Sequence, residues 1–252
     1  MLNRRLAIAA ALMLVAAPAF AQMAPSYGVP PIPDYVAKAV ASPDRTEAMT
    51  ARDGGRKPAE VFALSGVKPG DKVIEFGSFG WYDSTIISGV IGPRGHLYMY
   101  DLPYMQERTF EAGKTFTAAH KNAEHKVAKF DEVALPKGVD LAVFDMYYHD
   151  LKGKEVDTAK LNKAVFAALK PGGRVLVVDH RGEPGSGWRD STTIHRMDTA
   201  TIVEEMQGAG FRLAVNNGLF ANPKDDKSKR VFEPTLRGGT DRSLFVFVKP
   251  RA

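Results

Sequence analysis

The 252-residue chain contains no cysteine. This absence excludes disulfides, thiolate nucleophiles, and zinc or iron–sulfur sites with cysteine ligands. The chain also lacks a large excess of one charge, because 34 Lys and Arg stand against 29 Asp and Glu. No basic block and no basic stripe interleaved with aromatics occurs. Nucleic acid is therefore not an expected partner. A Gly-x-Ser-x-Gly motif is missing as well, so serine-based hydrolysis is not favoured.

Long hydrophobic runs are almost absent, and the longest lies at the N-terminus. Arg4 and Arg5 precede the apolar stretch Leu6–Val15, and an A-x-A cleavage pattern follows at Ala19–Ala21. The stretch is too short to span a bilayer, which is typical of a cleaved signal peptide at residues 1–21. We expect a periplasmic or secreted protein without a stable membrane anchor; the alternative is an uncleaved N-terminal anchor.

The mature part begins with a proline-rich segment. Residues 22–43 hold five prolines and are expected to form an irregular arm on the surface. A helix is predicted at Asp44–Asp53 and a second one at Pro58–Leu64, where proline suits the first helical position. The expected organisation is an N-terminal arm and helix over residues 22–57, followed by one domain over residues 58–252.

Within this domain, apolar strands alternate with helical segments. Continuous apolar runs such as Val175–Val178 are typical of parallel strands that are covered on both faces. Thr201–Glu204 fits a capping box and indicates a helix start. The predicted strands are Lys72–Phe76, His96–Tyr100, Val127–Phe130, Val139–Phe144, Arg174–Val178, Phe211–Val215 and Ser243–Val248, and the predicted helices are Tyr82–Val90, Pro103–Asn122, Asp157–Leu169 and Thr201–Ala209.

This order predicts an α/β, Rossmann-like, mostly parallel sheet with helices on both faces. Because the last two strands are joined without a crossover helix, the final strand should run antiparallel. Their connection, residues 216–242, is long and leaves the carboxyl edge of the sheet, so we expect a mobile lid over that edge.

The strongest local signal is the turn after the first predicted strand. Glu75 and Gly77 lie at its end, Gly80 opens the following helix, and Asp101 ends the next strand. Glycine lets a backbone approach a ligand, a helix N-terminus offers free N–H groups, and a carboxylate binds ribose hydroxyls. The alternatives are a salt bridge or helix cap for Glu75 and a cap of the next helix for Asp101.

Together with the segment Leu169–Val178, these positions resemble the class I S-adenosylmethionine (SAM)-dependent methyltransferases. More narrowly, the chain is similar to a group of exported bacterial predicted methyltransferases in the motifs Arg56–Glu60, Gly66–Gly70, Gly80–Tyr82, Val178–Arg181, Asn222–Asp225 and Phe247–Pro250.

The resemblance implies seven strands, with the last strand inserted antiparallel beside the sixth. It implies that Glu75, Gly77 and Gly80 line the methionine side of SAM and that Asp101 binds the ribose. Asp145, at the end of the fourth strand, is assigned to the cofactor as well. Phe79 stands where the family has a glycine, so we expect its ring to shift or block the cofactor.

Candidates for the acceptor side follow the fourth and fifth strands. Tyr148 or His149 could accept a proton as the methyl group arrives, because neutral histidine is a suitable base; the alternative is a loop histidine bonded to a carboxylate such as Asp150. Further candidates, for substrate binding, are His180, Arg181 and Trp188. Arg52, Arg56 and Lys57 either hold an anionic group or serve helix-end electrostatics. No metal site is expected, because no two of His149, His180 and His195 have the close spacing of a ligand pair.

Two hypotheses follow. The first is a SAM-dependent methyltransferase acting on a small-molecule acceptor, a reaction that needs alignment and at most one base. The second is a catalytically inactive protein of the same fold that binds a small ligand in the periplasm.

Overall fold

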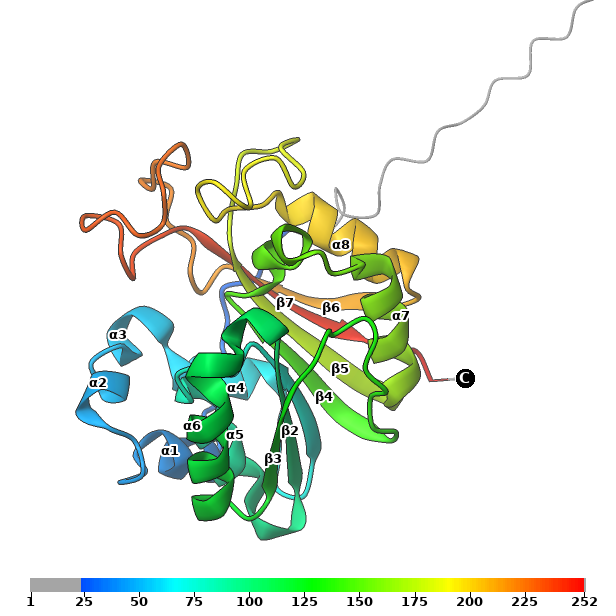
Figure 1. Ribbon diagram of the computed structural model, residues 1–252. Helices are drawn as coiled ribbons and strands as arrows, with labels where there is room; N and C mark the ends of the chain where they lie inside the picture. The colour runs from blue at the N-terminus through cyan, green and yellow to red at the C-terminus, as the bar shows by residue number, and fades with distance from the viewer. Residues whose placement is uncertain (1–23, 252) are drawn as a thin grey trace, which may run out of the picture.

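A seven-stranded sheet forms the centre of the computed structural model, which describes residues 24–251. Figure 1 shows the helices around this sheet. The predicted signal peptide, residues 1–21, lies outside the described residues. The strand order is β3-β2-β1-β4-β5-β7-β6, and β7 runs antiparallel to both of its neighbours while the other neighbouring pairs are parallel. The predicted fold class is therefore confirmed. The strands are β1 Lys72–Phe76, β2 His96–Asp101, β3 Ala123–Val127, β4 Val139–Asp145, β5 Leu169–His180, β6 Arg212–Asn217 and β7 Arg242–Val248.

Helices cover both faces of the sheet. Alternate residues of β5 enter opposite hydrophobic clusters: Val175 and Val177 lie in one, Leu176 and Val178 in the other. This double burial explains why the central strands are apolar without alternation. The helices are α1 Asp34–Val40, α2 Glu47–Thr50, α3 Asp53–Arg56, α4 Pro58–Ser65, α5 Tyr82–Ile91, α6 Gln106–Ala119, α7 Thr158–Ala168 and α8 Thr199–Gly208.

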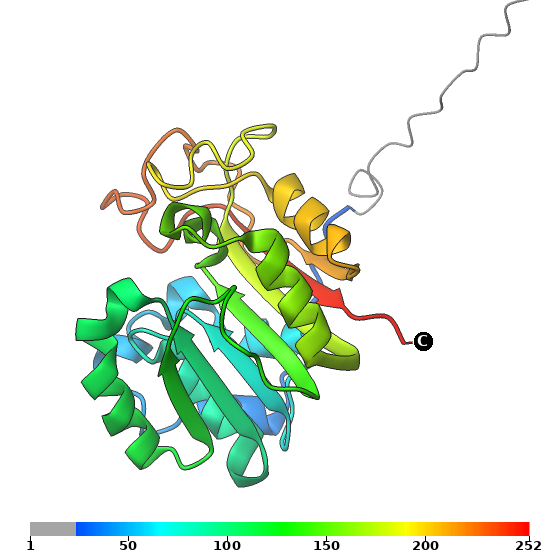
Figure 2. The ribbon, with the colours of Figure 1, turned by 45° about the vertical axis from the view of Figure 1, so that its right-hand side comes forward.

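The helices divide between the two clusters. Figure 2 shows α7 and α8 side by side, and their residues pack against β5 and β6. Helices α1, α4 and α5 supply the other cluster. In the described part of the chain, no helix is long and apolar enough to cross a membrane.

The third strand was predicted in the wrong place. β3 spans Ala123–Val127 instead of Val127–Phe130, and its side chains alternate in burial because it lies at the sheet edge. Because Glu124, His125 and Lys126 are polar, this strand contains no apolar run that would have indicated it. Phe130 is instead a fully buried core residue in the connection to β4.

The N-terminal predictions also need correction. The arm is not irregular throughout, because α1 forms within it and buries Val36 against the core. The helix predicted at Asp44–Asp53 is split into the short helices α2 and α3. By contrast, α4 begins at Pro58 as predicted.

Two later helices begin at residues other than those predicted. The capping-box prediction at Thr201 was wrong: α8 begins at Thr199, and the Asp198 side chain accepts a hydrogen bond from the Ala200 N–H. α6 begins at Gln106, after a single 3₁₀ turn at Pro103–Met105.

Candidate functional site

The carboxyl ends of β1 and β4 enclose a small cavity of about 70 Å³. Ligands of open α/β sheets bind beyond the carboxyl ends of the strands, where the strand order reverses. The order reverses here between β1 and β4. A larger, more open hollow of about 400 Å³ lies at the opposite end of the sheet, near Gly92 and Asn122. We place the candidate site at the smaller cavity because the strand-end carboxylates surround it.

Asp101 ends β2 and is fully buried. Its Oδ2 atom lies 2.9 Å from His125 Nε2 and accepts a hydrogen bond of 3.1 Å from Ser78 Oγ. Its Oδ1 atom accepts from the Phe79 N–H at 3.3 Å. Both carboxylate oxygens thus fasten the turn after β1, so Asp101 is directed at the predicted cofactor loop, not at the start of the next helix.

The partner His125 was not among the site residues predicted from the sequence. Its side chain is nearly buried and stacks edge-on against Trp81. The signal for it lay in the true position of β3, because a strand covering His125 runs parallel to the one that carries Asp101.

Glu75 is buried at the end of β1 and accepts a hydrogen bond of 2.7 Å from Ser84 Oγ. Burial raises the pKa of Glu75 to about 8, the Ser84 hydrogen bond opposes this shift, and the nearby carboxylates Asp101 and Asp145 add to it. At neutral pH this carboxyl group is therefore largely protonated.

Arg56 closes the other side of the cavity. Its Nη1 atom lies 2.8 Å from Asp145 Oδ2 and 3.4 Å from Asp83 Oδ2. Burial raises the pKa of Asp83 well above its usual value, and Asp145 raises it further. The guanidinium group also lies over the ring of Tyr82. Arg56 lies in the last turn of α3, where the helix-end alternative places it, and it also pairs with carboxylates of the site itself.

Tyr147 fills the space above Gly77. Gly77 has a φ of +79°, and a Cβ atom added there would lie 2.6 Å from carbons of the Tyr147 ring. The Tyr147 hydroxyl lies 3.1 Å from that of Tyr104. Phe79 is 44% exposed and its ring touches the edge of this cluster. Phe79 also lines the cavity, so its effect on the cofactor stays a prediction.

Gly80, the second glycine of the turn, is open. It has a φ of +89°, and a Cβ atom added there would meet no atom within 4 Å. A ligand or a side chain could approach its backbone without moving any other group. The two glycines assigned to the cofactor thus differ, since one is covered by an aromatic ring and the other is free.

Tyr148 and Trp188 lie together between α7 and α8, and their polar atoms are already used. Tyr148 donates a hydrogen bond of 2.8 Å to Glu205 Oε2 and accepts one of 2.6 Å from Asn162 Nδ2. Trp188 donates to the other Glu205 oxygen at 2.9 Å, and its ring stacks on Tyr148. Burial, followed by the Glu205 charge, raises the pKa of Tyr148 well above its usual value. Their catalytic and substrate-binding roles stay predictions.

His149 follows them and faces the end of β5. Its Nδ1 atom lies 2.6 Å from Asp179 Oδ1, and its backbone N–H donates to Asp179 Oδ2 at 2.7 Å. Burial lowers the pKa of His149, but the Asp179 carboxylate outweighs it and the net shift is upward. The carboxylate bonded to Nδ1 is therefore Asp179, whereas Asp150 lies near the other ring nitrogen at 3.6 Å.

His180 and Arg181, the remaining substrate candidates, contact the long segment of residues 218–241. His180 Nδ1 lies 2.8 Å from Thr240 Oγ1, and burial lowers the pKa of this histidine well below its usual value. Arg181 forms an ion pair of 3.3 Å with Asp241. Both side chains are thus turned toward the segment that was predicted to act as a lid.

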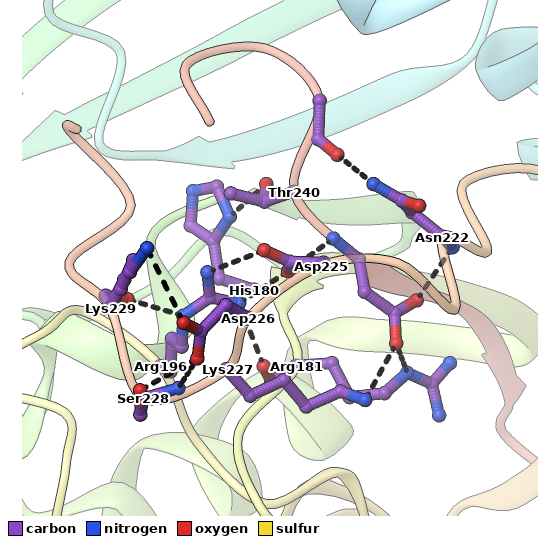
Figure 3. Close-up of polar contacts among 12 residues, drawn as sticks. His180, Arg181, Arg196, Asn222, Asp225, Asp226, Lys227, Ser228, Lys229 and Thr240 are labelled. Atoms are coloured by element: carbon purple, nitrogen blue, oxygen red, sulfur yellow. Dashed lines mark hydrogen bonds and ion pairs between the residues drawn. The ribbon is translucent and has the colours of Figure 1, made fainter. Parts of the chain in front are cut away.

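That segment is held by a buried ion pair (Figure 3). Arg196, whose side chain has no exposed surface, donates to both Asp225 oxygens at 2.7 and 3.0 Å. Its Nε–H donates to the Lys229 carbonyl, and Asp225 also accepts from the Asp241 N–H. The ion pair anchors the segment at Asp225 to the chain after β5, and the mobility expected of the lid stays a prediction.

Comparisons with known proteins bear on the fold. No family model matches the chain. Among solved structures, a SAM-dependent methyltransferase from Aquifex aeolicus superposes with a TM-score of 0.57 at 16% identity, over 85% of this chain and 98% of its own. Fibrillarin from Aeropyrum pernix, crystallised with natively bound SAM, gives 0.51 at 18% identity over 78% and 76%. The [4+2]-cyclase SpnF gives 0.55 at 12% identity over 90% and 100%.

Identities of this size establish architecture, and the cyclase shows that the architecture carries more than one named reaction. These superpositions extend over most of the seven-stranded sheet with its antiparallel β7. The chain has the fold of the class I SAM-dependent methyltransferases.

Proposed function

We propose that this protein is a SAM-dependent methyltransferase that acts on a small-molecule acceptor. The observation that carries the proposal is the grouping of Glu75, Gly77 and Asp101 at the ends of the neighbouring strands β1 and β2. In an open α/β sheet this edge is where a nucleoside ligand binds, with its ribose on the acid of the second strand. The structural neighbours named as SAM-dependent methyltransferases support the same choice.

The side chains present suit SAM, whereas the free space in this conformation does not. Ligand sites commonly measure about 300–1,000 Å³, and the cavity here holds about 70 Å³. The Tyr147 ring lies on Gly77, and both carboxylate oxygens of Asp101 already form hydrogen bonds with protein groups. We propose that binding requires the Tyr147 ring to leave Gly77 and the turn residues to release Asp101.

Within this proposal each group of residues has a separate task. SAM itself supplies the transferable methyl group on a sulfonium, so the chain needs to bind, orient and exclude water. Glu75, Asp101 and Asp145 would hold the cofactor. Residues at the carboxyl ends of the adjacent strands β4 and β5 would bind the acceptor; the rings of His149 and His180 lie 5.7 Å apart at this edge. We further propose that the protein works outside the cytoplasm, as its N-terminal sequence predicts.

Calorimetry tests the proposal. S-adenosylhomocysteine, the demethylated product, is titrated into the protein lacking residues 1–21, and we expect one site with micromolar affinity. Asp101→Asn should weaken binding at least tenfold. The matched control is Asp71→Asn, because Asp71 is also a buried carboxyl group but lies before β1, at the opposite edge of the sheet. Equal binding by wild type and Asp101→Asn would contradict the assignment.

A second function, that of an inactive ligand-binding protein, is favoured by one observation: the space above Gly77 is filled with aromatic carbon. If it holds, neither SAM nor its product should give heat or raise the melting temperature at millimolar concentration, while the variants keep their fold by circular dichroism. The same titration therefore separates the two proposals.

A further inference from the structure

Three potential metal ligands converge beside β5, outside the cavity described above. His149 Nε2 lies 3.3 Å from His195 Nδ1 and 3.6 Å from Asp150 Oδ1, and the last two atoms are 3.2 Å apart. Within residues 24–251, no other group of three or more histidines and carboxylates gathers its ligand atoms this closely. We propose that these three side chains form a binding site for a divalent transition-metal ion of the Zn²⁺ class.

The distances within the triangle match a metal site. Bonds of about 2.1 Å in a tetrahedral site place ligand atoms roughly 3.3–3.4 Å apart, and the three observed distances of 3.2, 3.3 and 3.6 Å bracket this value. A circle through the three atoms has a radius of about 1.95 Å, so an ion with such bonds would sit about 0.8 Å out of their plane. That position leaves a fourth ligand site on the far side of the ion.

The second observation concerns the ring orientation of His149. Its Nδ1 atom is held by Asp179 at 2.6 Å, and Asp179 is itself completely buried. A carboxylate on Nδ1 favours a proton on that nitrogen, so Nε2 is the ring nitrogen that faces the other two ligands. Metal-binding histidines usually show this arrangement, in which a carboxylate bonds the ring nitrogen that does not touch the metal.

His195 adds a third observation. Its backbone has a φ of +56°, a conformation that side-chain-bearing residues seldom adopt. This conformation places its ring at 85° to that of His149, with 5.3 Å between centroids. Strain of this kind is retained where the surroundings demand it, and it is frequent at binding sites.

The ligand set decides which ion fits. Two imidazole nitrogens and one carboxylate suit Zn²⁺, Fe²⁺ or Ni²⁺ better than Mg²⁺ or Ca²⁺, which prefer oxygen ligands throughout. The side chains of Asp150 and His195 are 20% and 19% exposed, so an ion can reach them from solvent. A site with three protein ligands leaves its fourth position for water or for an oxygen atom of a bound molecule. The proposal does not depend on methyltransferase activity.

The test uses the protein lacking residues 1–21, stripped with a chelator and titrated calorimetrically with ZnCl₂ in a buffer that does not bind metal. We expect one ion per chain, and a visible absorption band when Co²⁺ replaces Zn²⁺. Asp150→Asn and His195→Gly should each weaken binding by about 100-fold or more. Glycine is chosen because it accepts the positive φ of residue 195 at no steric cost, so this variant should keep its fold.

The matched control is His96→Gln, because His96 lies at the start of β2, away from the triangle, and should bind metal like the wild type. Circular dichroism and melting temperature verify that each variant is folded. The proposal is overturned if the wild type shows no saturable binding. It is equally overturned if Asp150→Asn and His195→Gly both bind one Zn²⁺ as tightly as the His96→Gln control.

Discussion

Replacing Tyr147 with alanine should increase the affinity for S-adenosylhomocysteine, because this ring occupies the space above Gly77. Tyr147 is 1% exposed and packs against Gly77, Phe79 and Phe130. An aromatic side chain buries about 150–250 Å². Exposing half of that area at about 25 cal/mol per Å² costs roughly 2–3 kcal/mol. The ligand must meet this cost whenever the wild-type ring moves aside.

The cost converts into an affinity ratio. If the open state lies about 2–3 kcal/mol above the closed one, only roughly 1 molecule in 25 to 1 in 200 is competent, and the apparent Kd rises by the same factor. Tyr147→Ala removes this requirement, so the Kd for S-adenosylhomocysteine should fall by up to roughly two orders of magnitude. Calorimetric titration of both proteins measures the ratio directly.

The matched control is Tyr148→Ala. Tyr148 is also fully buried, but its hydroxyl contacts Glu205 and Asn162 between α7 and α8. Both substitutions should lower the free energy of unfolding by about 3–5 kcal/mol, as large aromatic truncations do, whereas only Tyr147→Ala should tighten binding. A Kd for Tyr147→Ala within threefold of the wild-type value would refute the reasoning that this ring obstructs the ligand.

Three further predictions concern buried residues, two at the site and one in the segment after β5. The folded protein keeps a proton on Glu75 up to about pH 8, whereas the unfolded chain loses it near pH 4.5, so wild-type stability should fall as pH rises through this window. In urea titrations, the stability advantage of Glu75→Gln over the wild type should grow from near zero at pH 4.5 to a few kcal/mol at pH 8. An advantage that does not change with pH would contradict this prediction. Gly77→Ala should cost about 1–3 kcal/mol more than Gly80→Ala, because both residues have positive φ but only the first is covered by a ring; equal melting temperatures would argue against that contact. Arg196→Ala should destabilise by about 3–5 kcal/mol because it leaves Asp225 buried without its partner, and a loss below 1 kcal/mol in the same urea titration would show that the pair is dispensable.

The sequence interpretation succeeded where a local pattern and a buried environment coincide. β1 matched to the residue, since its apolar run and the glycine that follows define both its ends. The β3 prediction failed because an edge strand carries polar side chains at its exposed positions. With Glu124 and Lys126 at these positions, the sequence of β3 has the pattern of a loop. α1 was missed because prolines at its N-terminal side outweighed the short apolar pattern of Val36 and Ala39.

The sequence alone determined the order of strands and helices and the presence of Glu75 and Asp101 at strand ends, because these depend on spacing along the chain. Only the tertiary structure decided which residues contact the carboxyl ends of these strands. Tyr147 covers Gly77 although 70 positions separate them, and His149 meets His195 across 46. Such contacts, and the pKa of about 8 for Glu75, arise from burial and from neighbours that the fold brings together, and no local pattern encodes them.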